Sequence, residues 1–223
     1  METMIRSCSD LVELIGAWGF VPLFRNQIRG FSVEELTPPE LWFSDTADGP
    51  WEWKGPAIRE SGCAYGKFFQ NKAVFISREW FCDFANYRRD GYDFDARFED
   101  GLASFNDKQI YDTLEGTPSL LSKELKQLAG FGKDGRKGFD TILTRLQMQG
   151  YVTTADFEYL RDKHGAPYGW GVARYAVPEK LFGEAFSSTV YVRTPEESRQ
   201  RIIDHLTALF PDADPKQILK ITG

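Results

Sequence analysis

One segment of the chain, Ser119 to Gly150, gathers basic and short polar side chains whose chemistry suits a phosphate backbone. It holds six Lys or Arg against three Asp or Glu, whereas the whole chain has a net charge of −6. Lys and Arg bind phosphate oxygens, and hydroxyl side chains reach base edges. The segment therefore predicts contact with nucleic acid, although a solvated helix face of mixed charge would give the same count. The predicted DNA-contacting residues are Lys133, Arg136, Lys137, Thr141, Thr144 and Arg145, with Lys163 from a later turn.

Two short helices and a hairpin are expected to position these residues. Leu121, Leu125 and Leu128 recur with helical spacing and should face inward, as should the apolar residues of 139–146. Each run ends at a glycine, which is typical of a helix C-terminus. The apolar period then changes towards two on either side of a polar turn at 163–167, which predicts a β-hairpin. Helix, turn, helix and hairpin is the order of a winged helix-turn-helix.

The predicted fold class is therefore α+β, with the winged helix-turn-helix core over 101–180. A helical and hairpin region over 1–100 should pack on this core, and a helical extension should follow over 181–223. With 223 residues, 42% of them hydrophobic, the chain is long enough to bury one sizeable core. We expect the three parts to form one compact unit.

The N-terminal region is expected to alternate helices with extended or irregular segments. Residues 21–32 suggest an extended linker, and the Gly55–Pro56 pair suggests a break after the tryptophans. Residues 64–77 predict a β-hairpin, which leads into a helix whose last turn holds Arg88 and Arg89, where cations favour the helix dipole. The acidic stretch 91–101 is interpreted as a boundary of solvated carboxylates before the core.

A set of large aromatic residues has two interpretations, core or pocket. Tryptophan is costly to expose, so burial in the core is favoured. The alternative is a pocket or stacking surface, because aromatic faces also bind planar rings. The candidate pocket residues are Trp51, Trp53, Phe68 and Trp80, and Trp42 belongs to the same aromatic set.

Catalytic and metal-binding patterns are sparse in this sequence. The two histidines, His164 and His205, belong to no HExxH pair, and the glycines of 130–138 lack the spacing of a phosphate-binding loop. Cys8, Cys63 and Cys82 are an odd number without metal-ligand spacing, which favours reduced thiols. We therefore predict no metal and no cofactor, and a cytoplasmic protein that is not embedded in a membrane, since no apolar run reaches the length of a span.

Several segments resemble a known family. They read GPWEWKGPAIRES, AYGKFF followed by KAVFIS, EWFCDFANYRRDGYDFDARFEDG and LQMQGYVTTADFEYLRDKHGAPYGW. Together they resemble a bacterial and archaeal family related to the AlkZ (YcaQ) winged-helix DNA glycosylases, from about Leu11 to Phe182. The resemblance implies winged-helix units and double-stranded DNA as the partner. The glycosylases themselves act on alkylated or cross-linked bases and use a Gln-x-Gln motif near the N-terminus.

The chain departs from that catalytic motif. Where the motif would follow the first helix, the chain reads GFVPLFRNQIRG. Gln147 and Gln149 form a QMQ triplet, but they end the second helix of the pair, where residues two apart point in different directions. Asn26, Gln27 and Glu52 are catalytic candidates by side-chain type only. The leading prediction is a DNA-binding protein related to the glycosylases. An active glycosylase without Gln-x-Gln and a non-enzymatic protein- or ligand-binding module remain the alternatives.

Overall fold

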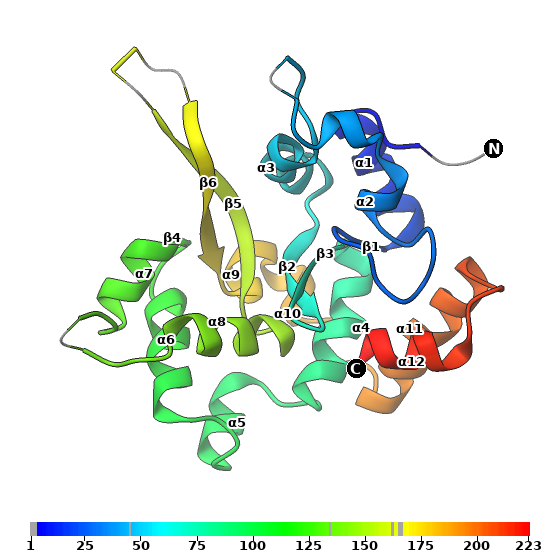
Figure 1. The fold of residues 1–223 in the computed structure, drawn as a ribbon. Helices are drawn as coiled ribbons and strands as arrows, with labels where there is room; N and C mark the ends of the chain where they lie inside the picture. The colour runs from blue at the N-terminus through cyan, green and yellow to red at the C-terminus, as the bar shows by residue number, and fades with distance from the viewer. Residues whose placement is uncertain (1–3, 45, 134, 162, 165–166) are drawn as a thin grey trace.

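The computed structural model describes residues 4–44, 46–133, 135–161, 163–164 and 167–223. In these residues, helices surround a six-stranded sheet with the order β1-β3-β2-β5-β6-β4, and neighbouring strands are antiparallel (Figure 1). The α+β class expected from the sequence is confirmed. The strands are β1 (Phe20–Pro22), β2 (Ala64–Phe69), β3 (Lys72–Ile76), β4 (Leu120–Leu121), β5 (Thr153–Arg161) and β6 (Pro167–Ala176).

The first part of the chain packs helices against β1 and β3. The hydroxyl of Ser7 accepts the N–H of Asp10 at 3.2 Å and so caps the first helix. The segment expected as a linker begins with a strand instead, because β1 pairs with β3 in the register Phe20↔Ile76. The helices here are α1 (Cys8–Trp18), α2 (Val33–Leu36), the 3-10 helix η1 (Pro39–Leu41) and α3 (Pro50–Ser61).

The predicted break at Gly55–Pro56 is wrong, because α3 continues through it. A proline inside a helix removes one hydrogen bond and costs about 3 kcal/mol. Burial of Trp53 and Ala57 on the same helix offsets this cost by packing against α1. The side chain of Glu52 also accepts the N–H of Gly49 at 2.9 Å and fixes the helix start.

The β2–β3 hairpin and the helix after it follow the expected order. Gln70 and Asn71 have φ values of 50° and 62°, which is the left-handed backbone of a type I′ turn. The next helices are α4 (Arg78–Arg89) and α5 (Phe94–Glu99). The latter replaces the acidic boundary expected there, since Asp93 caps it by accepting the N–H of Ala96 at 2.8 Å.

The central segment has the predicted order of helices and hairpin. It comprises α6 (Phe105–Glu115), β4, α7 (Ser122–Leu128), α8 (Phe139–Met148), β5 and β6. Leu125 faces inward as expected, but Leu128 is 64% exposed. The chain reverses after α7, where the N–H of Phe131 donates to Lys126 O at 2.8 Å. The buried Phe131 therefore occupies the core in place of Leu128.

The C-terminal part forms helices, as predicted. Thr194 and Glu197 form a capping box at the start of the longest helix here, and Ile202 and Leu206 are buried on it. This helix packs along α4 (Figure 1). The helices are α9 (Pro178–Phe182), α10 (Glu184–Ser187), α11 (Pro195–Leu209) and α12 (Pro215–Thr222).

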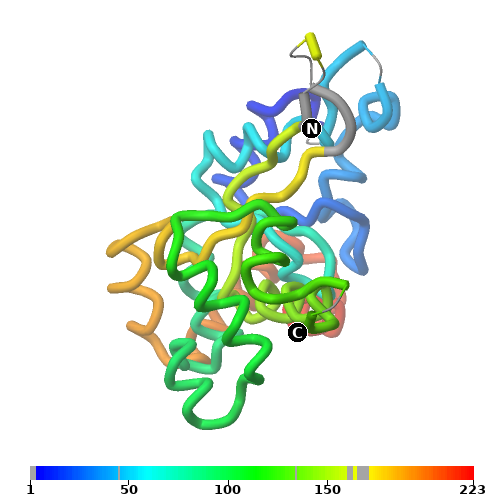
Figure 2. Tube along the Cα trace, turned by 90° about the vertical axis from the view of Figure 1, so that its left-hand side faces the viewer, coloured from blue at the N-terminus to red at the C-terminus, as the bar shows by residue number. Residues whose placement is uncertain are grey.

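Buried side chains form three clusters linked by the sheet. One lies between the β2–β3 hairpin, α4 and the C-terminal helices, a second lies among α1, α2 and α3, and a third lies among α5, α6, α7 and α8. The outer part of β5–β6, the arm, projects beyond the helices of the third cluster (Figure 1). Figure 2 shows that the arm lies at the same end of the molecule as the segment before α3.

Candidate nucleic-acid interface

The loop between α7 and α8 is held by its own backbone. Arg136 N–H donates to Gly130 O at 3.0 Å, and Phe131 forms an isolated bridge with Arg136. Gly138 then precedes α8 with a φ of 85°, a left-handed conformation that favours glycine. The first backbone N–H groups of α8 are thus presented beside the basic loop residues, an arrangement that favours anions.

A shallow depression of about 360 Å³ collects the basic residues at this point. It is lined by four basic residues, Lys126, Lys133, Arg136 and Lys137. Among the described residues that line it, the acidic one is Asp140. Lys133 and Lys137 are exposed. The surface has an excess of positive charge at the N-terminus of α8, in contrast to the acidic chain as a whole.

Two of the predicted contact residues are engaged by the protein itself. Arg136 donates to Ala129 O at 3.2 Å, and its guanidinium carbon lies 5.2 Å from the ring centroid of Phe105. Arg145 binds the buried carboxylate of Asp107, with Nη2 and Oδ1 2.5 Å apart. These two arginines stabilise the packing of α8 and its loop, so the exposed lysines are the freer of the predicted contact residues.

The polar face of α8 is only partly open to solvent. Thr141 is exposed, whereas Thr144 is half-buried, with its Oγ1 3.4 Å from Nζ of Lys67. Gln147 is buried and is engaged by backbone groups at both ends of its amide. The backbone N–H of Lys67 donates to Gln147 Oε1 at 3.1 Å, so β2 covers this part of the helix. Base reading along the whole of α8 is therefore opposed by the fold.

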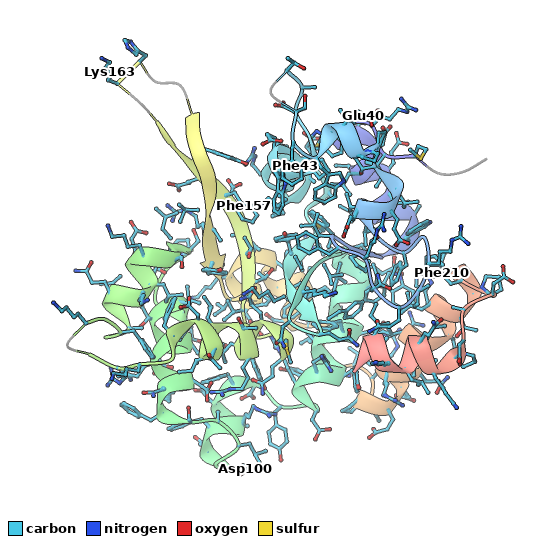
Figure 3. All side chains as sticks on the ribbon, in the orientation of Figure 1. Glu40, Phe43, Asp100, Phe157, Lys163 and Phe210 are labelled. Carbon is cyan, nitrogen blue, oxygen red and sulfur yellow. The ribbon has the colours of Figure 1, made fainter. Side chains whose placement is uncertain are left out.

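Lys163 is the predicted contact residue that does not lie on α8 or on the loop before it. It is exposed at the outer end of the β5–β6 hairpin, as Figure 3 shows. Closer to the body, Arg174 of β6 is paired with Glu158 of β5, and Arg59 of α3 is paired with Asp156 of β5. The arm therefore presents Lys163 at its tip and neutralised pairs closer to the body.

The structure divides the predicted aromatic set. Trp53 and Phe68 are buried in different clusters, and Trp80 stacks on His205 with 4.1 Å between ring centroids. Trp42 and Trp51 of the aromatic set line a described pocket of about 400 Å³. The other lining residues, which the sequence did not single out as a site, are Phe24, Arg25, Glu34, Pro39 and Phe43. The sequence signal for them was weak: one aromatic, Phe43, beside Trp42 after a proline-rich turn.

A second cavity of about 500 Å³ is lined by residues of α3 and β5. Glu52, Arg59 and Tyr159 are among its lining residues. The hydroxyl of Tyr159 donates to Trp51 O at 3.1 Å, and burial raises the pKa of this tyrosine. Glu52 is thus a candidate acid here by position as well as by type, and its carboxylate also accepts the N–H of Gly49.

The other catalytic candidates by type have structural contacts. The side chain of Asn26 closes its own loop, because it donates to Phe31 O at 2.6 Å and accepts the N–H of Ile28 at 2.8 Å. Gln27 donates to Gln70 Oε1 at 3.0 Å. In the described part of the chain, no three His, Cys, Asp or Glu side chains gather closely enough to hold a metal ion.

One buried cation lies between α3 and the arm. Nζ of Lys54 is 4.8 Å from the ring centroid of Trp51 and 4.4 Å from that of Phe157. Burial lowers the pKa of Lys54, and the nearby Glu52 carboxylate partly opposes that shift. This lysine was missed by sequence reasoning because a single Lys inside an aromatic helix has no distinctive spacing.

Comparison with known proteins identifies a family. A family model described as AlkZ related matches residues 5–223. No curated protein and no solved structure matches the chain. Across the described residues, no helix has both the length and the apolar character needed to span a membrane. Because the matching model covers nearly the whole chain, this protein belongs to the AlkZ-related family.

Proposed function

We propose that the protein binds double-stranded DNA through the α7–α8 surface and that residues 105–176 form a winged helix. The order α6, β4, α7, α8, β5, β6 supports the winged helix, as does the separate cluster that these elements bury. The observation that carries the proposed function is the group of basic residues lining the depression at the N-terminus of α8. Family membership agrees with it, because the family is related to DNA-repair glycosylases.

The contacts in this proposal are mainly to phosphates. Lys133 and Lys137 are exposed, whereas Gln147 is buried and Thr144 contacts Lys67. Phosphate contacts carry little sequence information, so binding should depend weakly on DNA sequence. Lys163 would add a phosphate contact from the arm. We place this activity in the cytoplasm, where thiols stay reduced, because Cys8, Cys63 and Cys82 are free.

Fluorescence anisotropy with a labelled duplex at several salt concentrations tests the proposal. The double variant Lys133→Ala, Lys137→Ala removes two exposed charges without touching the core. It should weaken binding and lower the slope of log K against log salt by about 2. A matched control is Lys180→Ala with Lys216→Ala, on the C-terminal helices, which should leave the slope unchanged. Equal binding by wild type and the Lys133, Lys137 variant would contradict the proposal.

A second candidate function, base excision, is favoured by the family and by the position of Glu52. This carboxylate lines the cavity between α3 and the arm, and one of its oxygens accepts the N–H of Gly49, which leaves the other oxygen for a nucleotide placed there. The test is to incubate the protein with alkylated duplex DNA and to measure abasic sites. Activity that is lost in Glu52→Gln while DNA binding persists would support excision. Release no greater than that of a boiled sample would reject it.

A further inference from the structure

The pocket formed by the segment after β1, by α2 and η1 and by the start of α3 is walled by aromatic rings. The ring centroids of Trp42 and Trp51 are 5.7 Å apart with an interplanar angle of 85°, so the two indoles form perpendicular walls. Phe24 lies 6.3 Å from Trp42 and 6.0 Å from Trp51. Phe43 lines the same pocket and is 80% exposed, at the end of the molecule from which the arm projects (Figure 3). Such a cavity suits a planar ring.

Charged groups lie around this pocket. The indole Nε1–H of Trp42 is closed off from solvent, and Trp42 is only 9% exposed. Trp42 therefore contributes the face or edge of its ring to the pocket, and the charge comes from other residues. Arg25 is exposed, and its Nε lies 3.6 Å from Glu34 Oε1. A surface pair with this separation is weak, so Arg25 is able to take an anionic partner.

The position of Lys54 favours an uncharged ring over a cationic one in this pocket. Its ammonium already occupies one face of Trp51 at 4.8 Å from the centroid. Aromatic cages bind cations through the negative faces of their rings. Here Lys54 already covers one face of Trp51, so that face is not open to a second cation. Lys54 and Arg25 would also repel a cationic ligand. An uncharged ring joined to an anion avoids both costs.

We propose that the pocket lined by Phe24, Trp42, Phe43 and Trp51 binds an uncharged nucleobase whose phosphate lies near Arg25. The base stacks against the aromatic walls, and the phosphate replaces Glu34 as the partner of the Arg25 guanidinium, while Glu34 keeps the backbone N–H of Arg25. The nucleotide comes either from solution or from an unpaired position in a strand, and the chemistry of recognition is the same. The pocket shares no residue with the α7–α8 surface, so this proposal and the proposed function fail separately.

Titration of the protein with guanosine 5′-monophosphate, followed by calorimetry, is the direct test. Saturable binding at one site is expected. Phe43→Ala should weaken it by about tenfold, because one stacking surface is lost. Arg25→Ala should weaken the nucleotide but leave the affinity for guanosine unchanged. Both residues are exposed, so both variants should fold. Leu128→Ala, an exposed apolar residue on α7, is the matched control and should bind as wild type does.

Titrations with further ligands test whether the bound base is uncharged and where the nucleotide comes from. The 7-methyl derivative of the same nucleotide, whose base is cationic, and choline should both bind more weakly than the parent nucleotide. A short single-stranded oligonucleotide that binds more tightly than the mononucleotide, and that loses affinity in Phe43→Ala, identifies a strand as the source. Equal or weaker binding of the oligonucleotide identifies the free nucleotide.

Three results would overturn the inference. They are the absence of saturable nucleotide binding, unchanged binding in Phe43→Ala, and tighter binding of the methylated cation or choline than of the uncharged base. Anisotropy with duplex DNA and the Phe43→Ala variant tests whether nucleobase binding by the pocket is separate from duplex binding by the α7–α8 surface. Phe43→Ala should retain the salt-dependent duplex binding that depends on Lys133 and Lys137.

Discussion

The buried guanidinium of Arg89 donates to the carboxylate of Glu179 across 2.6 Å and joins α4 to α9. The same guanidinium donates to Gly150 O and to the hydroxyl of Tyr191, each at 2.8 Å. It also lies 4.6 Å from the ring centroid of Tyr151. One side chain thus connects the end of α8, the start of α9 and the segment before α11.

Arg89→Met should therefore destabilise the fold strongly. Removing one partner of a buried ion pair typically costs about 3–5 kcal/mol, because the other partner loses its compensation. Chemical denaturation should show this fall in the free energy of unfolding. Lys123→Met, at an exposed position on α7, should change it by less than about 0.5 kcal/mol. A loss in Arg89→Met no larger than that of the control would show that the pair contributes little.

Asp107 should matter more than its neighbour on the same helix, Asp112. Asp107 Oδ2 accepts the N–H and the hydroxyl of Ser104, and its Oδ1 binds Arg145. Asp107→Ala removes the capping box and a buried acceptor, so we expect a loss of about 2 kcal/mol. Asp112→Ala breaks an exposed pair with Lys108 and should cost less than about 0.5 kcal/mol. Similar midpoints of thermal unfolding for the two variants would contradict this ranking.

Lys54→Met should stabilise the protein, by about 1 kcal/mol, because methionine fills a similar volume without the cost of burying a charge. Burial lowers the pKa of Lys54 below its ordinary value of 10.5. At a pH between the pKa of Lys54 in the folded protein and 10.5, the unfolded state binds more protons than the folded state, so the free energy of unfolding rises with pH. Below that range, the full free-energy cost of burying the charged lysine is present. The difference in unfolding free energy between variant and wild type should accordingly shrink as the pH approaches 10.5. A destabilised variant would mean that the contacts with Trp51 and Phe157 outweigh burial.

Gly49→Ala should disturb the aromatic pocket. A Cβ at this position would lie 1.8 Å from Leu41 O, so the backbone must move. The segment that carries Trp42 would then shift away from Trp51. We expect a loss of stability of about 1–3 kcal/mol and a reduced near-UV circular dichroism signal from the tryptophans. Gly132→Ala, where a Cβ meets nothing within 4 Å, is the control and should preserve both.

Local patterns predicted most of the elements and little of the site. Alternating residues and a turn located the β2–β3 hairpin, and capping residues located α6 and α11, because these signals act over a few residues. The continuity of α3 through Pro56 depends on packing against α1, which local propensity does not contain. The predicted basic residues lie near α8, but the pairing of Arg145 with Asp107 joins residues 38 positions apart, which local patterns do not contain.

The aromatic set shows the same limit. Sequence spacing grouped Trp51 with Trp53, yet side chains two apart on a helix diverge, so one lines a pocket and the other enters the core. The partners of Trp51 come from Phe24 and from the segment after η1, which the fold brings together. A single sequence contains no signal that predicts these contacts between distant segments.

The sheet is continuous across β2 and β5 through one register pair, Tyr65↔Thr154. The hydroxyl of Thr153 completes the junction, since it accepts Tyr65 N–H at 3.2 Å and donates to Tyr65 O at 3.1 Å. These contacts join residues 88 positions apart, and such closures carry a large entropic cost during folding. We therefore expect the β2–β3 hairpin to form before β5 is available, and the two halves of the sheet to meet late, both in refolding and as the chain leaves the ribosome.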